Sequence, residues 1–152
     1  MFEAWLIAPL SALISILVGF YFYHYVNKQD SGTKQMQEIA TAIQEGADAF
    51  LKREYTTLAI FVGVVAVLLC LFLPSPLWTA TEPIRNVQLT LAYVFGSFCS
   101  ALAGYLGLNV ATKANLKAAK AAQEGLNKEF PIGFRGGAVM GLAVVGLGLL
   151  GI

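Results

Sequence analysis

Four long stretches without a charged side chain limit the possible folds more than any other feature of this sequence. They cover residues 4–26, 55–74, 87–112 and 136–152. A helix rises 1.5 Å per residue, so a stretch of about 20 residues crosses the roughly 30 Å hydrocarbon core of a bilayer. The composition agrees, since 57% of the residues are hydrophobic and only 12% are charged. The sequence therefore predicts an all-α membrane protein, a polytopic bundle of four transmembrane helices.

The basic residues between these stretches predict the orientation of the chain. Four lie between the first and second stretches and five between the third and fourth, whereas Arg85 alone lies between the second and third. Basic residues concentrate on the cytoplasmic side, so the amino terminus, which has Glu3 and no basic residue, is predicted to lie outside. The compact loops favour a prokaryotic plasma membrane over an acidic organelle. We expect spans over residues 4–26, 55–74, 87–112 and 134–152, cytoplasmic connections over 27–54 and 113–133, and an external connection over 75–86.

The first cytoplasmic connection has the pattern of an amphipathic helix. Its apolar residues recur at spacings of three and four, at Met36, Ile39, Ala40, Ile43, Ala47, Phe50 and Leu51. We therefore predict a helix that continues without a break into the second span. Its carboxylates Glu38, Glu45 and Asp48 share one face, and Asp48 can pair with Lys52 four residues later. We interpret them as a solvated helix surface, because no facing element completes a metal site; a role beside a substrate site stays open.

A basic stripe is predicted on an alanine-rich helix that continues from the third span. Lys113, Lys117 and Lys120 follow the spacing i, i+4, i+7. We interpret this stripe as a topology signal. The alternative is that it attracts an anionic lipid or a phosphate-bearing substrate.

Small residues are the predicted contacts between helices. In lipid, helices associate mainly through close van der Waals approach, which small side chains permit. A glycine inside a helix costs about 1 kcal/mol relative to alanine, so the glycine of the first connection indicates the close approach of another backbone. The predicted packing residues are Gly46, the small-xxx-small series Gly96, Ser100 and Gly104, and the GxxxG pair Gly137 and Gly141.

No catalytic constellation is visible in the sequence. The four stretches contain no ionisable group of the kind that passes ions across a membrane, and no known phosphate-loop, metalloprotease or nucleophile motif occurs. Cys70 and Cys99 lie inside apolar stretches and are interpreted as free thiols, and His24 as an interfacial residue. We assign no catalytic, substrate-binding or metal-binding residue, and the net charge of +1 gives no indication of a nucleic-acid partner.

Three segments together resemble one known family. They read MQEIATAIQEGADAFLKREY, GSFCSALAGYLGLNVATKANLKAAKAAQEGLN and FRGGAVMGLAVVGLGLLG. In this order they resemble the amino-terminal quarter of the membrane-embedded inorganic pyrophosphatases, which are ion pumps driven by pyrophosphate hydrolysis. The resemblance runs from Gly32 onward, and the first span agrees by position only. Lys113 and Lys117 stand where the family more often has arginine, an exchange that matters at a bidentate phosphate site and little in a topology signal.

The resemblance implies the outer-ring part of a larger sixteen-helix fold, with helices extended into the cytoplasm, that usually forms a homodimer. It implies that magnesium-bound pyrophosphate is hydrolysed on the cytoplasmic side while a proton or sodium ion crosses the membrane, and it leaves open whether potassium is needed. The catalytic and ion-gate residues of the family lie after the part that this chain resembles. We therefore expect a scaffold that is inactive by itself.

The last stretch ends without a polar flank or an aromatic belt. We therefore expect a fragment of a longer protein. The alternative is a small, complete four-helix membrane protein, an assembly or structural subunit without enzymatic activity.

Overall fold

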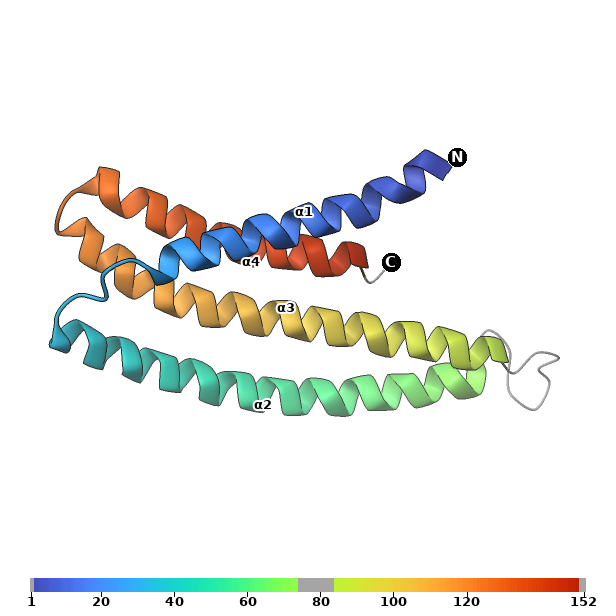
Figure 1. Cartoon of the computed structure of the whole chain (residues 1–152). Helices are drawn as coiled ribbons and strands as arrows, with labels where there is room; N and C mark the ends of the chain where they lie inside the picture. Colours follow the sequence, from blue (N-terminus) through green and yellow to red (C-terminus); the bar gives the residue numbers. More distant parts are fainter. Residues whose placement is uncertain (1, 74–83, 151–152) are drawn as a thin grey trace.

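The computed structural model describes residues 2–73 and 84–150, and this part of the chain is almost entirely helical. All four helices are long and apolar enough to cross a membrane, which confirms the prediction of an all-α membrane bundle. The helices are α1 (Phe2–Asn27), α2 (Lys34–Phe72), α3 (Ile84–Ala122) and α4 (Leu126–Leu150), shown in Figure 1.

The helices run up and down, and α4 holds the bundle together. It packs against both α1 and α3, whereas α2 packs against α3, and α1 and α3 hardly touch each other. Figure 1 shows α2 and α3 side by side along their whole length. The α1–α2 link and the α3–α4 turn meet at one end of the bundle, which we call the basic end.

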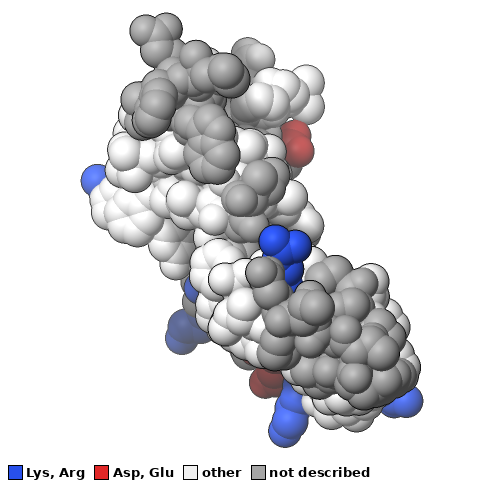
Figure 2. Space-filling view, turned by 90° about the vertical axis from the view of Figure 1, so that its right-hand side faces the viewer, with Lys and Arg blue, Asp and Glu red and all other residues white. Residues whose placement is uncertain are grey.

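The charges are distributed as the topology signal predicts. Lysines of the α1–α2 link, of the last part of α3 and of the first part of α4 gather at the basic end, while Arg85 is the second residue of α3 at the other end. Figure 2 shows that other end, where uncharged residues cover most of the described surface. The two connections rich in lysine and the start of α3 with Arg85 thus lie at opposite ends of one bundle, and which end faces the cytoplasm stays a prediction.

The prediction of a single helix from the first connection into the second span is confirmed by α2. The helix begins after Thr33, whose hydroxyl accepts a hydrogen bond from the Met36 amide (3.4 Å), an N-cap arrangement. It ends at Phe72, and Leu73 is extended (φ −124°, ψ 138°). This is the conformation that a following proline imposes on the preceding residue. Trp78, a possible membrane anchor, and the rest of the external connection up to residue 83 lie outside the described residues.

α3 likewise continues through the predicted basic stripe to Ala122. A short turn with Gly125 at φ +123° then reverses the chain, a left-handed conformation that glycine adopts without a steric cost. α4 begins directly after it, at Leu126. Residues 134–150 of the predicted span therefore belong to a helix that starts inside the predicted connection.

Side-chain hydrogen bonds tie α2 to α3, among them one from the Asn86 side-chain amide to the Cys70 carbonyl oxygen (3.0 Å) and one from Tyr55. The Tyr55 hydroxyl donates a hydrogen bond to the Ala101 carbonyl oxygen (2.6 Å). A Cβ atom added at Gly104 would lie 3.1 Å from this hydroxyl oxygen. Gly104 therefore leaves the space in which the Tyr55 ring reaches the α3 backbone.

Replacing Tyr55 with phenylalanine is expected to lower the free energy of unfolding by about 0.5–1.5 kcal/mol, because the hydrogen bond is lost while the ring remains. The midpoint of thermal unfolding of the purified protein in detergent measures the effect. Tyr21→Phe is the matched control, since Tyr21 is 62% exposed. Equal shifts for the two variants would contradict a specific role of the Tyr55 contact.

Candidate functional site

The predicted packing residues fall into two groups in the structure. Gly104 lies at the α2–α3 contact, and Ser100 lies in the groove between the same two helices. A Cβ atom at any of the other four glycines would meet no atom within 4 Å in the part of the chain that the structure describes. Their packing role therefore stays a prediction. These four are Gly46, Gly96, Gly137 and Gly141.

Three other glycines make the closest helix contacts, and the sequence analysis missed them. A Cβ atom at Gly107 would lie 2.6 Å from Met140 Cγ, and one at Gly146 would lie 2.7 Å from Ile16 Cγ1. At Gly136 it would overlap the Ala114 side chain. A sequence pattern that indicates such a contact surface is the seven-residue spacing of the small residues at 107, 114 and 121. Residues seven apart lie on the same face of a helix, two turns from each other.

The apolar stripe of α2 is wider than the surface that α3 covers. Its residues at 36, 40, 47 and 51 are half-buried, and α3 is the helix that α2 packs against. Ile39, Ile43 and Phe50 are instead 54–61% exposed. The predicted amphipathic face is therefore split into a covered part and an open part.

The carboxylates of α2 remain on the surface. Glu38, Glu45 and Asp48 are all exposed, as expected for a solvated helix face. Within residues 2–73 and 84–150 no three histidine, cysteine or acidic side chains form a group that could hold a metal ion. The predicted ion pair between Asp48 and Lys52 is not present among the described residues, and both residues are exposed.

Lys117 is the most constrained charged residue of the bundle. It lies beyond the third apolar stretch, yet only 7% of its surface is exposed. Its Nζ donates hydrogen bonds to the carbonyl oxygens of Val26 (2.9 Å) and Asn27 (2.6 Å). These carbonyls end α1, where the helix leaves acceptors unsatisfied and carries partial negative charge. The lysine thus caps α1 from α3 and fastens the two helices at the basic end.

The same burial has an electrostatic cost. Loss of hydration lowers the pKa of the Lys117 ammonium, and the neighbouring Lys113 cation lowers it further. The two short hydrogen bonds to carbonyl oxygens offset part of this cost, because they favour the charged form. Two of the three N–H donors of the Lys117 ammonium are therefore used at the α1 terminus.

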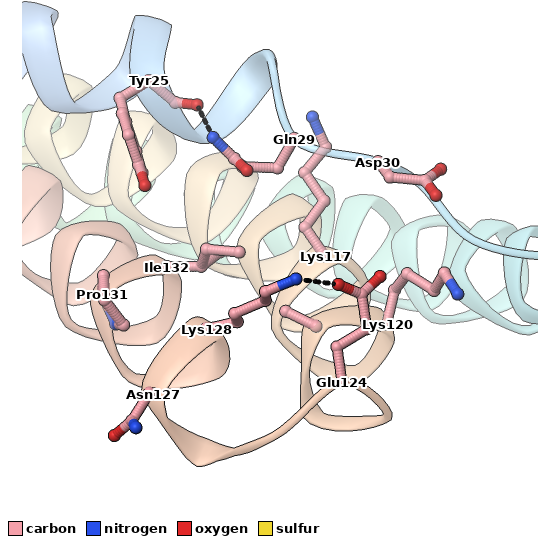
Figure 3. A pocket seen from close by; sticks show the side chains of 11 residues that line it. Tyr25, Gln29, Asp30, Lys117, Lys120, Glu124, Asn127, Lys128, Pro131 and Ile132 are labelled. Atoms are coloured by element: carbon pink, nitrogen blue, oxygen red, sulfur yellow. Dashed lines mark hydrogen bonds and ion pairs between the residues drawn. The ribbon is translucent and has the colours of Figure 1, made fainter.

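A pocket of about 270 Å³ opens beside this junction, between the ends of α1, α3 and α4. Figure 3 shows its charged side chains. Lys128 Nζ donates to Glu124 Oε2 (2.7 Å), a pair that lowers the pKa of the Glu124 carboxyl. Lys120 Nζ donates to Gln123 Oε1 (3.3 Å). The lining residues are Tyr25, Gln29, Asp30, Lys117, Lys120, Ala121, Glu124, Asn127, Lys128, Pro131 and Ile132.

The charges of this pocket do not converge on a common point. Two of its lysines are hydrogen-bonded to a backbone or a carboxylate, and Asp30 and Glu124 add negative charge. Beside the pocket, the Arg135 guanidinium lies 3.8 Å from the centroid of the Tyr25 ring, a cation–π contact that joins α4 to α1. The arrangement stabilises the junction of three helices and offers no preorganised anion site.

Comparison with known proteins identifies similar sequences over the whole length of the bundle. The model of the family described as inorganic H+ pyrophosphatase matches residues 13–152. The chain is 45% identical over 150 residues to the "K(+)-insensitive pyrophosphate-energized proton pump 2" of Moorella thermoacetica, an alignment that covers 99% of this chain and 20% of the relative. It is 43% identical to the "K(+)-insensitive pyrophosphate-energized proton pump" of Methanosarcina mazei, covering 95% of this chain and 20% of the relative.

A relative with a different transported ion in its name is also similar. The "Putative K(+)-stimulated pyrophosphate-energized sodium pump" of Bacteroides thetaiotaomicron is 38% identical, over 97% of this chain and 19% of the relative. The chain therefore spans about a fifth of the length of the curated relatives it matches.

Proposed function

The chain belongs to the inorganic H+ pyrophosphatase family, and on this basis we propose that it is the amino-terminal part of a membrane pump that couples pyrophosphate hydrolysis to ion transport. The observation that carries the proposal is the family match over residues 13–152. Relatives named as proton pumps and as a sodium pump are both similar to the chain, so the transported ion is a proton or sodium. One of these relatives is named as insensitive to potassium and the other as stimulated by it. The residues of this segment do not distinguish between the two types.

Within such a pump this segment acts as a scaffold. Its most constrained cation, Lys117, fastens two helices together, and its closest contacts are glycines packed against neighbouring helices. These features support a role in holding helices in place rather than in chemistry.

We propose that magnesium and pyrophosphate bind outside this segment, in a region that corresponds to the part of the relatives not covered by this chain. The carboxylates Glu38, Glu45 and Asp48 do not fit a magnesium site, because they are exposed along a single helix. Magnesium held by protein needs oxygen ligands arranged octahedrally, which one helix face does not provide. No step of the reaction is assigned to residues of this segment.

Transport by vesicles that contain the full-length protein tests this function. We expect added pyrophosphate to drive proton or sodium uptake, and we expect ATP to drive none. Vesicles without the protein are the control. Pyrophosphate hydrolysis without ion uptake, or no hydrolysis at all, would contradict a pump. We also propose that the full-length protein is a homodimer, as the family resemblance implies, and the mass of the purified protein in detergent tests this.

We further propose that the basic end faces the cytoplasm of a prokaryotic cell and that the amino terminus lies outside. The clustering of lysines at this end supports the orientation. The test uses a protein in which Cys70 and Cys99 are replaced by alanine and a single cysteine replaces either Lys34 or Arg85. Labelling with a membrane-impermeant thiol reagent then shows on which side of the membrane each position lies. We expect intact cells to be labelled at position 85 only, and inverted vesicles at position 34 only. The reverse pattern would refute the orientation.

A further inference from the structure

A second groove, of about 500 Å³, lies between α1 and α3 over the surface of α4. It exists because α4 separates the two outer helices, which hardly touch each other. Its walls and floor are largely apolar, with Ile16 and Phe20 from α1, Leu106 from α3, and Val139 and Leu147 from α4. The shape and the lining suit a hydrocarbon chain.

Apart from Tyr105, the polar residues that line this groove lie toward the basic end. They are the Tyr23 hydroxyl, the Asn109 amide and the Lys113 ammonium. All three residues are half-buried. Among the described residues, none of these three side-chain groups forms a hydrogen bond or an ion pair. Two hydrogen-bond donors and a cation thus surround one end of an apolar groove with their bonding capacity unused.

The depth of Lys113 agrees with the level of lipid phosphates. The third apolar stretch ends at Thr112, so Lys113 is the first charged residue beyond the hydrocarbon-compatible part of α3. Lipid headgroups begin where the hydrocarbon core ends. A basic residue at this level attracts the anionic headgroups of the bilayer.

We propose that this groove binds an anionic phospholipid. The lipid phosphate accepts hydrogen bonds from Lys113 and Asn109, and one acyl chain lies along Phe20 and Leu106 on the floor made by α4. Charge complementarity favours a lipid over another helix of the protein, because an apolar helix laid over the groove would leave Lys113 without a counter-charge. The proposal requires only that Lys113 lies at the boundary of the membrane. A test of the lipid site is therefore independent of a test of the transport function.

Native mass spectrometry of the full-length protein tests the site with phosphatidylglycerol and phosphatidylcholine as probes. The wild type is expected to retain phosphatidylglycerol preferentially. Lys113→Gln should lower this retention about fivefold, the factor that corresponds to roughly 1 kcal/mol for one basic residue near lipid phosphates. Lys34→Gln is the matched control, because Lys34 lies at the same end, is exposed and does not line the groove.

A second variant tests the groove without changing the charge. Gly19 is buried in the lining of the groove, and a Cβ atom there would lie at an ordinary contact distance, 3.5 Å from Leu142 Cβ. A larger apolar side chain at this position therefore adds volume inside the apolar part of the groove. Gly19→Leu should lower the retention of phosphatidylglycerol although Lys113 is intact. Inorganic phosphate at millimolar concentration should not displace the lipid.

Three results would overturn the proposal. Equal losses in Lys113→Gln and Lys34→Gln would show a diffuse charge effect. Displacement of the lipid by inorganic phosphate would show a free-anion site. If the wild type retained no lipid and neither groove variant changed this result, the groove would be filled by another helix of the protein.

Discussion

Replacing Lys117 with methionine is expected to lower the free energy of unfolding by about 2–4 kcal/mol. Hydrogen bonds from a charged donor contribute about 1.5–3 kcal/mol each, and Lys117 makes two of them, to Val26 and Asn27. Methionine keeps the length and the apolar part of the side chain but leaves two carbonyls at the end of α1 without this donor. Chemical or thermal unfolding of the purified protein in detergent measures the loss.

Two variants separate this capping role from charge alone. Lys120→Met removes a half-buried neighbouring cation whose hydrogen bond is made to the Gln123 side chain (3.3 Å), and a loss within about 1 kcal/mol is expected, because one ordinary hydrogen bond is removed. Lys117→Arg keeps a cation with several donors and should retain most of the stability. If Lys117→Met and Lys120→Met had equal effects, the capping of α1 would be refuted.

Replacing Gly136 with alanine is expected to destabilise the α3–α4 contact by about 1–3 kcal/mol. The added methyl group would overlap the side chain of Ala114, and extra volume in a close-packed contact costs about this amount because the backbones must separate. The gain in helix propensity from glycine to alanine, up to about 1 kcal/mol, offsets only part of the loss.

The adjacent glycine is the matched control. At Gly137 an added Cβ atom meets no atom within 4 Å of the described residues, so Gly137→Ala should be neutral or stabilise the protein by up to about 1 kcal/mol. The comparison also tests the GxxxG pair predicted from the sequence. A larger loss at Gly137 than at Gly136 would show that Gly137 packs against an element outside this segment.

The number and the type of helices could be predicted from the sequence because both depend on local quantities. The length of each uncharged stretch and the spacing of its apolar residues do not depend on distant residues. The end of α2 at Phe72 is equally local, since the clash with Pro74 acts on the preceding residue, Leu73. The continuation of α3 through its lysines followed from the periodicity of an alanine-rich segment.

The packing surfaces could not be predicted in the same way. A four-residue and a seven-residue spacing of small residues both occur in the last stretch and in the one before it. Which of them meets a neighbour depends on how each helix is rotated about its own axis. That rotation is set by contacts between distant segments, and here it selected Gly107, Gly136 and Gly146.

The basic stripe separates the two kinds of information most clearly. The sequence alone determined that Lys113, Lys117 and Lys120 follow one another on a helix beyond the third apolar stretch, because their spacing is a local property. Only the tertiary structure decided that Lys117 caps α1 and that Lys113 borders a groove, whereas the bond from Lys120 to Gln123, three residues later, is local. The reason is that the surroundings of Lys117 and Lys113 include α1, a helix whose position is set by packing and not by the lysine spacing.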